Sequence, residues 1–419
     1  MRAAENHDDV ARAVRLVAAD PADRLGMLRR EVDRGLRTRR YLRYRESAEW
    51  ADEASPVVDE LAQAVEVEPS RELVALLERA VGHVVKVIVR ADDSDGMIGG
   101  LAQRLLDLHE KTCAAGVAEP AALARWMVRF TFEDQDFFMV DPVRYAAALG
   151  DKGLAVYRSE VAKRSANPDR FAASYAAERL AVLDGDVNRV VELLGGDLTR
   201  PYQYIRVAEA MLELRREGDA LAWARRGIAE TTGWQVAKLY DLAAGVLAHR
   251  GDGTSVLELR REQHQRMPSS STYSRLQGAA EAVRAWQDER AAARAVLAAR
   301  DQGGLVDVLL ADGEVDEAWS AATNGGWDPG EQRWRRLAEA REPTDPAGAL
   351  GIYLRLTDAA LLQADRRAYR EAVRHLKAAR RAATAADLSS AFEDRLVALR
   401  EQHRRRPTLI SMLDKAGLR

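Results

Sequence analysis

The sequence predicts an all-α protein: an α-solenoid of tetratricopeptide-like helix pairs preceded by an irregular α-helical N-terminal half. Two observations predict the helices. Ala, Leu, Arg and Glu dominate the composition, and only 12 of the 419 residues are proline, while aromatic residues make up 6%. Such a composition favours helix by intrinsic propensity. The third observation, a repeat in the C-terminal half, predicts how the helices are paired.

The repeat consists of Gly-Asp pairs placed 33 residues apart, at positions 185–186, 218–219 and 251–252. An apolar helical face precedes each pair and another follows it. Gly supplies the left-handed residue that ends the first helix, and Asp caps the second. Gly313 marks a further turn of this kind. A helix pair of this length is typical of tetratricopeptide repeats, although the full signature of that class is missing.

In the N-terminal half, helix starts are predicted from proline and serine. Ser55-Pro56 reads as an N-cap followed by a proline in the first turn, and Ser70 after Pro69 marks another start. Residues 83–90 are rich in β-branched side chains, but they continue an apolar helical run without a turn signal, so a helix is predicted there. The segment SANPDRF, residues 165–171, is the predicted boundary between an irregular domain (1–165) and the repeat domain (170–419).

Toward the C-terminus the pattern predicts two long helices separated at Asp365. Pro407 breaks the pattern again, because proline cannot continue a helix. The short helix expected after it would cap the exposed end of the array.

The cysteine count, the apolar runs and the charge limit the classes of protein that the chain can belong to. The single cysteine, Cys113, can form neither an internal disulfide nor a cysteine zinc cluster, which fits a reducing cytoplasm. No apolar leader or membrane-length run is found, so we expect a cytoplasmic protein without a membrane partner. The formal net charge is −3, but residues 24–45 hold nine Arg against two acids, and residues 46–72 hold nine acids against one Arg. The sequence sets no oligomeric state.

The stretch DDSDGMIGG, residues 92–100, raises the question of a cation or phosphate loop. As an EF-hand loop it fails at two ligand positions, which are Ala91 and Ala102. It spells neither a dinucleotide fingerprint nor a P-loop. We therefore expect Ser94 or Asp95 to cap the following helix. A partner or ion contact at Asp93, Ser94, Asp95 and Gly96 is the alternative, and a hard-cation site shared with the acidic residues of segment 132–141 is a further one.

No catalytic constellation is recognisable. The seven histidines are scattered, and His109 in HEKTC lacks the second histidine of a zincin helix. His109 and His375 are expected at polar positions on helix faces. The sequence therefore predicts a protein that is not an enzyme, with no cofactor and no metal.

Two arginine-rich segments could contact nucleic acid. Residues 29–45 interleave arginine with tyrosine, and the candidates there are Arg37, Arg40, Tyr41, Tyr44 and Arg45. Arginine grips phosphates, and aromatic rings stack on bases. Segment 374–419 carries 11 basic residues against 5 acids. Because arginine is also a good helix former, a solvated helix face is the alternative for both segments.

Several stretches resemble known bacterial families. REGDALAWARRGI, LVDVLLADGEVDEAWSAA and LISMLDKAGL are similar to the helical C-terminal region of bacterial SWIM zinc-finger proteins. YLRYRESAEWADEASPVVDEL and ADDSDGMIGGLAQRLLDLH resemble a related bacterial family of unknown function. The SWIM finger needs three cysteines and a histidine, so Cys113 alone cannot build it. What the resemblance implies is a bacterial helical-repeat scaffold without the zinc.

The leading hypothesis from the sequence is a non-catalytic scaffold that binds a protein or peptide on the concave face of the repeats. The candidate contacts on or beside repeat helices are Tyr202, Tyr204, Arg206, Trp234 and Lys238. Association with nucleic acid through segments 29–45 and 374–419 is the alternative.

Overall fold

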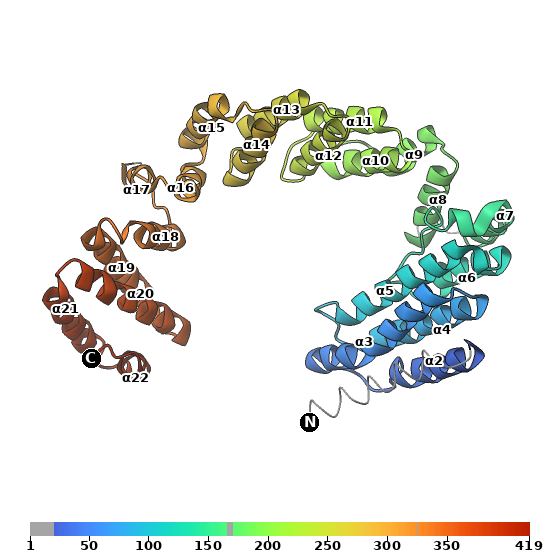
Figure 1. Ribbon diagram of the computed structural model, residues 1–419, viewed down its shortest axis with the longest axis horizontal. Helices are drawn as coiled ribbons and strands as arrows, with labels where there is room; N and C mark the ends of the chain where they lie inside the picture. The colour runs from blue at the N-terminus through green and yellow to red at the C-terminus, as the bar shows by residue number, and fades with distance from the viewer. Residues whose placement is uncertain (1–20, 166–170, 325) are drawn as a thin grey trace. The chain divides into compact units, whose positions relative to one another are not determined.

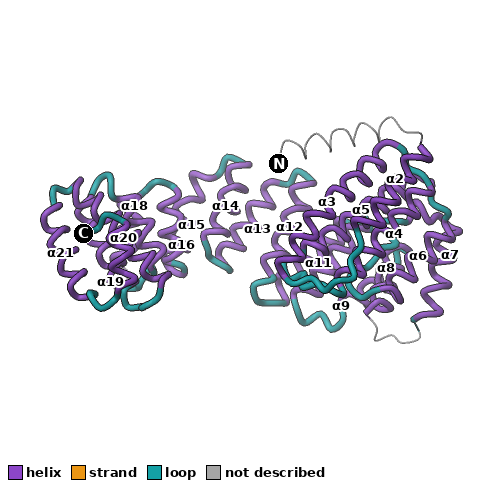
Figure 2. The backbone as a smooth tube through the Cα atoms, turned by 90° about the horizontal axis from the view of Figure 1, so that it is seen from below, coloured by secondary structure: helices purple, strands orange, loops and turns teal. Residues whose placement is uncertain are grey.

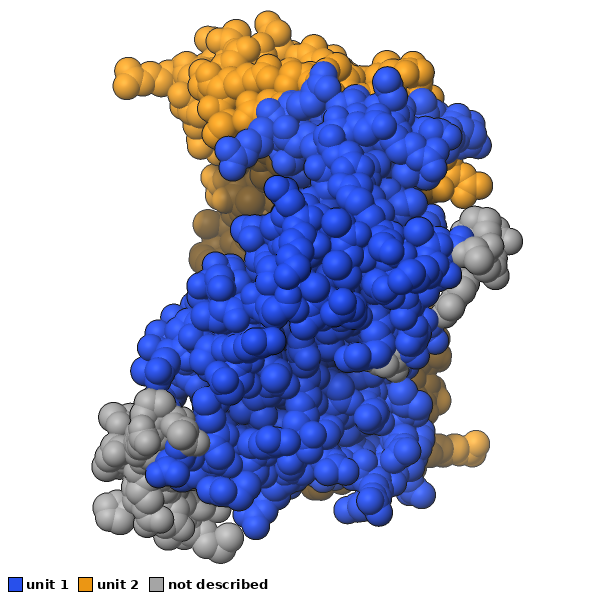
Figure 3. All heavy atoms as spheres, turned by 90° about the vertical axis from the view of Figure 1, so that its right-hand side faces the viewer, with its two compact units in different colours: residues 1–199, 206–216 blue, residues 200–205, 217–419 orange. Residues whose placement is uncertain are grey.

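The computed structural model describes residues 21–165, 171–324 and 326–419. Across these residues the chain is helical, as predicted, and no β-strand is formed (Figures 1 and 2). The one extended pairing in the described part is an isolated parallel bridge between Leu42 and Ala91. By internal packing the chain divides into two compact units, residues 1–199 with 206–216 and residues 200–205 with 217–419 (Figure 3).

The described part of unit 1 holds eight helices and two short π-helical segments. They are α2 (Pro21–Gly35), α3 (Tyr44–Val67), α4 (Arg71–Ile88), α5 (Met97–Thr112), η1 (Cys113–Val117), α6 (Pro120–Arg129), η2 (Phe130–Asp134), α7 (Ala146–Arg164), α8 (Phe171–Leu183) and α9 (Val187–Gly195). The predicted domain boundary at 165–171 lies mostly outside the described residues. The division between the units falls further along the chain, within and just after α10 (Pro201–Glu213).

Unit 2 continues from α10 as a succession of helices. They are α11 (Glu217–Glu230), α12 (Val236–His249), α13 (Gly253–Arg266), α14 (Ser270–Ala282), α15 (Trp286–Arg300), α16 (Gln302–Ala311), α17 (Val315–Asn324), α18 (Glu331–Arg341), α19 (Pro346–Ala360), α20 (Arg366–Ala385), α21 (Ser389–Gln402) and α22 (Pro407–Lys415). Helices that follow one another pack as adjacent pairs. Among the described α-helices, the substantial contacts join helices that are neighbours or next neighbours in chain order.

Helix α4 packs mainly against α5 and also contacts α2 and α3. Its predicted helical state over the β-branched run is confirmed up to Ile88. Val81, Val84, Val85 and Val87 are buried, and each buried side chain of this size stabilises by about 2 kcal/mol. That gain exceeds the few tenths of a kcal/mol by which valine disfavours a helix.

The helix start predicted at Ser70 and the break predicted at Asp365 are confirmed. Ser70 caps α4 by accepting a hydrogen bond from the Leu73 N–H at 3.2 Å, and Asp365 caps α20 through the Arg367 and Ala368 N–H groups. The helix start predicted at Ser55-Pro56 is wrong, because α3 runs through Pro56. Proline costs an interior helix about 3 kcal/mol. Here the buried face of α3 on both sides of it, including Ala54, Val57 and Val58, favours one continuous helix.

Six helix hairpins share one turn geometry. A residue in the left-handed region stands two positions before the second helix of each; these residues are Gly185, Arg215, Gly251, Arg284, Gly313 and Asp387, with φ between +56° and +77°. The next N–H donates to the carbonyl oxygen five positions earlier, for example Asp252 to Leu247 at 3.0 Å. This is the Schellman motif, which satisfies carbonyl groups at the end of the first helix.

The turns predicted at Gly185, Gly251 and Gly313 are confirmed, but the one assigned to Gly218 is wrong. Gly218 lies in the first turn of α11, and Arg215 takes the left-handed conformation instead. The equal spacing of the Gly-Asp pairs therefore does not describe the turns. Where the prediction holds, Asp252 also caps the next helix by accepting from the Ser255 N–H at 3.0 Å.

A non-glycine residue in the left-handed region costs about 1 kcal/mol. We therefore expect Arg284→Gly to raise the free energy of unfolding by about 0.5–1 kcal/mol. Gly251→Ala should lower it by about 1 kcal/mol, although the added methyl group meets nothing within 4 Å. Urea unfolding followed by circular dichroism measures both. Gly278→Ala, inside α14 and also in open space, is the control and should stabilise. Equal effects at positions 251 and 278 would show that the turn geometry imposes no strain.

Candidate functional sites

The loop between α2 and α3 and the first turn of α3 expose a dense row of arginine and tyrosine side chains. The row, called here the Arg-Tyr ridge, consists of Arg37, Arg39, Arg40, Tyr41, Arg43, Tyr44 and Arg45. Tyr41 and Tyr44 are 66% and 55% exposed. All five residues of segment 29–45 predicted as nucleic-acid contacts belong to the ridge.

The ridge is fixed to the loop after α4. Leu42 is buried; its N–H donates to the Arg90 carbonyl oxygen at 2.9 Å, and its carbonyl oxygen accepts from the Asp92 N–H at 2.8 Å. The Glu46 carboxylate also accepts from the Arg43 N–H at 2.9 Å. The structure thus brings together two segments that were singled out separately in the sequence, the arginine-tyrosine segment and the Asp-Gly loop.

In that loop the predicted helix start is confirmed, but the predicted capping residue is wrong. The Asp93 carboxylate, not Ser94 or Asp95, caps α5, accepting from the Ile98 N–H at 2.9 Å and the Gly99 N–H at 2.8 Å. Ser94 donates to Asp92 instead, and Asp95 accepts a single longer hydrogen bond, from the Met97 N–H at 3.4 Å. Gly96, with φ +73°, supplies the left-handed residue that directs the Asp93 carboxylate to these donors.

The shared cation site suggested for the two acidic segments is not formed among the described side chains. Within them, no group of three or more His, Cys, Asp or Glu residues is arranged to hold a metal ion. Asp93 is occupied by capping α5, while Asp141, from segment 132–141, binds Arg179 at 2.8 Å.

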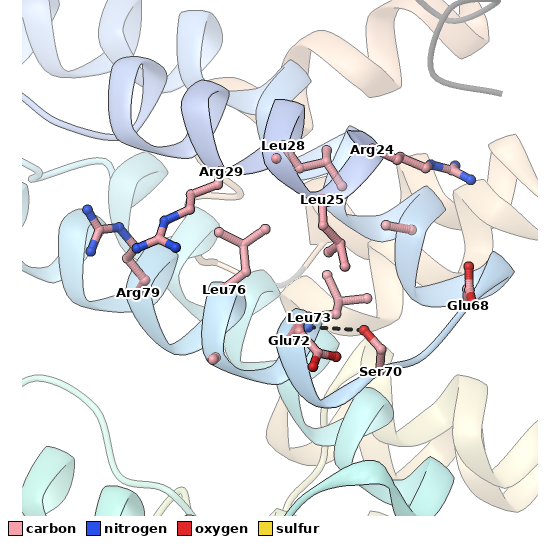
Figure 4. A pocket seen from close by; sticks show the side chains of 13 residues that line it. Arg24, Leu25, Leu28, Arg29, Glu68, Ser70, Glu72, Leu73, Leu76 and Arg79 are labelled. Atoms are coloured by element: carbon pink, nitrogen blue, oxygen red, sulfur yellow. Dashed lines mark hydrogen bonds between the residues drawn. The ribbon is translucent and has the colours of Figure 1, made fainter. Parts of the chain in front are cut away.

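A cavity of about 700 Å³ opens between α2 and α4. Figure 4 shows four leucines converging on its interior from the two helices, with Arg29 and Arg79 at one end and Arg24 and Glu68 at the other. The leucines are Leu25, Leu28, Leu73 and Leu76. A space of this size can hold a small ligand or the apolar side chains of a partner. The cavity could not be predicted from the sequence, because its walls come from helices brought together by folding.

Arg79, at one end of the cavity, belongs to an ion network. Arg79 donates to both oxygens of Asp33 at 2.7 and 3.0 Å, and the His83 ring nitrogen lies 3.0 Å from the same carboxylate. Hydrogen bonds from Arg79 and His83 hold the pKa of Asp33 well below its usual range. Burial lowers the pKa of His83 more than Asp33 raises it, so this imidazole is neutral at pH 7. The network fixes Arg79 at the cavity mouth.

The five partner-binding candidates occupy different environments. Trp234, in the loop before α12, is 81% exposed; Tyr202, near the start of α10, is 40% exposed, and Lys238 is exposed on α12. Arg206 belongs to unit 1 and pairs with Glu178 at 2.6 Å. The prediction for Tyr204 is wrong, because this residue is fully buried and its hydroxyl donates to Glu230. It packs in the core and is not available to a partner.

A buried polar cluster in unit 1 was missed by sequence reasoning. His109 is fully buried, with Nδ1 2.8 Å from the Tyr145 hydroxyl and the imidazole 4.2 Å from the Trp126 ring between centroids. The neighbouring Cys113 is buried too, and burial raises the pKa of its thiol to about 12. The thiol is therefore protonated at pH 7 and a poor nucleophile. His375 is likewise buried rather than on a polar face.

Several C-terminal arginines, unlike Arg40 and Arg45 of the ridge, donate to backbone carbonyl groups. Seven basic side chains of segment 374–419 bind groups of the chain itself: Arg374, Arg380, Arg381, Arg395, Arg400, Arg404 and Arg406. Arg400 and Arg406, for instance, donate to the backbone carbonyls of Leu418 and Leu361 at 2.8 Å. The nucleic-acid hypothesis is therefore less well supported here than for segment 29–45.

Comparisons with known proteins leave the family open. No family model matches the chain, and no curated protein matches it significantly. The resemblance to the helical region of SWIM zinc-finger proteins stays a prediction. Among the described residues, no helix has both the length and the apolar character needed to cross a bilayer.

Proposed function

We propose that the chain is a non-catalytic helical-repeat scaffold that binds a protein or peptide partner. The observation that carries the proposal is the local packing of the helices: six hairpins share the Schellman turn, and substantial contacts join near neighbours along the chain. Tetratricopeptide-like solenoids are built in this way, with each repeat contacting the repeats beside it. The resemblance to the helical region of SWIM proteins agrees with such a scaffold.

In a solenoid, side chains that face away from neighbouring repeats can vary without disturbing the core, and the concave face becomes an extended binding surface. Trp234 is the best-placed contact in unit 2, because tryptophan dominates the energetics of protein interfaces and this one is almost entirely exposed. Tyr202 and Lys238, also in unit 2, remain candidate contacts. The residues of the proposed surface are thus Trp234, Tyr202 and Lys238.

The test compares two exposed apolar residues of unit 2. Tagged wild type, Trp234→Ala and Leu362→Ala are purified from native lysate after nuclease treatment, and the co-purifying proteins are quantified by mass spectrometry. Leu362 is the control, since it is 82% exposed but lies outside the candidate set. The amount of a partner bound through Trp234 should fall about thirtyfold with Trp234→Ala and should be unchanged with Leu362→Ala. An identical set of proteins from all three samples would exclude this surface.

A further inference from the structure

The Arg-Tyr ridge is not accounted for by the scaffold. Seven large polar side chains project from nine consecutive positions, with Leu42 as the buried anchor among them. We propose that this ridge binds single-stranded nucleic acid, with phosphates on its arginines and bases stacked on Tyr41 and Tyr44. Such a site is independent of the surface around Trp234, which belongs to unit 2.

The ridge arginines are available to a ligand. Arg40 and Arg45 approach Glu46 and Glu49 at 3.4 Å, and their side chains keep 78% and 90% exposure. Exposed pairs of this kind are weak, so an incoming phosphate can take the place of the carboxylate. The Arg79–Asp33 pair, at 2.7 and 3.0 Å, is by contrast a bidentate contact. Phosphates can therefore replace the ridge's own carboxylates at little cost.

The aromatic rings select for unpaired bases. Tyr41 and Tyr44 stand on either side of Leu42 in the sequence, and both residues are more than half exposed. Stacking on an aromatic ring strengthens the binding of a base, and only an unpaired base can offer its face. The bridge to Arg90 and Asp92 holds the intervening backbone in place before binding, which reduces the entropy lost when a strand is bound.

The negative charge beside the ridge makes a flat anionic surface, such as a membrane, an unfavourable partner. The bridge places Asp92 next to Leu42, and Asp93 and Asp95 follow in the same loop. A bilayer rich in acidic lipids would bring its charges against these carboxylates as well as against the arginines. A single strand can lie along the arginines and leave the loop, so it is the partner that the charge pattern favours.

The test measures binding of the full chain to fluorescent oligonucleotides of about 12 nucleotides, within the site sizes known for single-strand binding. Oligo(U), oligo(dT), a DNA duplex and vesicles containing phosphatidylserine are compared by anisotropy or sedimentation over a range of salt concentrations. The proposal expects single strands to bind more tightly than duplex, and binding to weaken steeply with salt.

Two variants separate the contributions. Tyr41→Ala/Tyr44→Ala should weaken single-strand binding at least tenfold without changing the salt slope, because it removes stacking and no charge. Arg37→Glu/Arg40→Glu/Arg45→Glu should abolish binding. Arg367→Glu/Arg370→Glu/Arg405→Glu, at exposed C-terminal positions with the same charge change, is the control and should bind nearly as wild type.

Three outcomes would overturn the proposal: no single-strand binding at low salt, an equal loss in the control, or binding that survives both ridge variants. Ridge-dependent binding to vesicles but not to oligonucleotides would identify a membrane contact instead. All of these results are independent of the Trp234 experiment, which is performed after nuclease treatment.

Discussion

Arg179→Ala is expected to lower the free energy of unfolding of unit 1 by about 3 kcal/mol. Arg179, on α8, donates to Asp141 at 2.8 Å and to Glu213 at 2.5 Å, and its side chain is only 13% exposed. Burial opposes its charge, but the hydrogen bonds to Glu213 and Asp141 outweigh that effect and raise the pKa of Arg179. Removing the guanidinium leaves the largely buried Asp141 without its cation.

Urea unfolding measures the loss at Arg179, with Arg189→Ala as the matched control. Arg189 pairs with Glu192 at 2.7 Å on the surface of α9, where such a pair is worth under about 0.5 kcal/mol. Arg179→Met/Asp141→Asn should lower the free energy of unfolding less than Arg179→Ala does, because neither member of the pair then remains buried as an unpaired charge. If the two single alanine variants were equally stable, the network would have no structural role.

The second large effect is expected at Gly227, on the buried side of α11. A methyl group there would lie 2.6 Å from Cβ of Tyr204 and 2.8 Å from Cδ1 of Leu239. The Leu239 methyl group can rotate away, but Cβ and Cγ of Tyr204 lie next to the backbone and cannot, so the helix must shift. We expect Gly227→Ala to lower the free energy of unfolding by about 2 kcal/mol, even after the gain in helix propensity.

The control for Gly227 is Gly245→Ala on α12, where the added methyl group meets nothing within 4 Å. This substitution should stabilise by about 1 kcal/mol, the propensity difference between the two residues. Thermal unfolding of both variants gives the comparison. A gain at both positions would mean that α11 can move away from Tyr204 without loss.

Signals contained within a few residues were predictable. The helix starts at Ser70 and Asp252 are predictable because a cap needs only a short side chain and the N–H groups two or three positions ahead. The turn predicted at Gly218 is wrong for a reason that is also local. The left-handed position is fixed by where the first helix ends, and Arg215 occupies it although glycine would be less strained.

What folding brings together from distant segments could not be predicted. Tyr204 carries the same sequence signal as Tyr202, and only the packing of α11 against it decides that one is buried. The sequence predicts His109 at a polar position on a helix face, but in the fold Tyr145 and Trp126 enclose its side chain. For the same reason the composition of the Arg-Tyr ridge was visible in the sequence, while the backbone bridge that fixes it beside the Asp-Gly loop was not.

The near-neighbour packing of the helices has a mechanical consequence. In a fold stabilised by distant contacts, tension on the ends must break many contacts before any length is released. Here each hairpin is held by the helices just before and after it. One hairpin can therefore detach while the next stays folded, and a pulled chain would lengthen in a series of small steps. A partner bound across several hairpins would resist that extension.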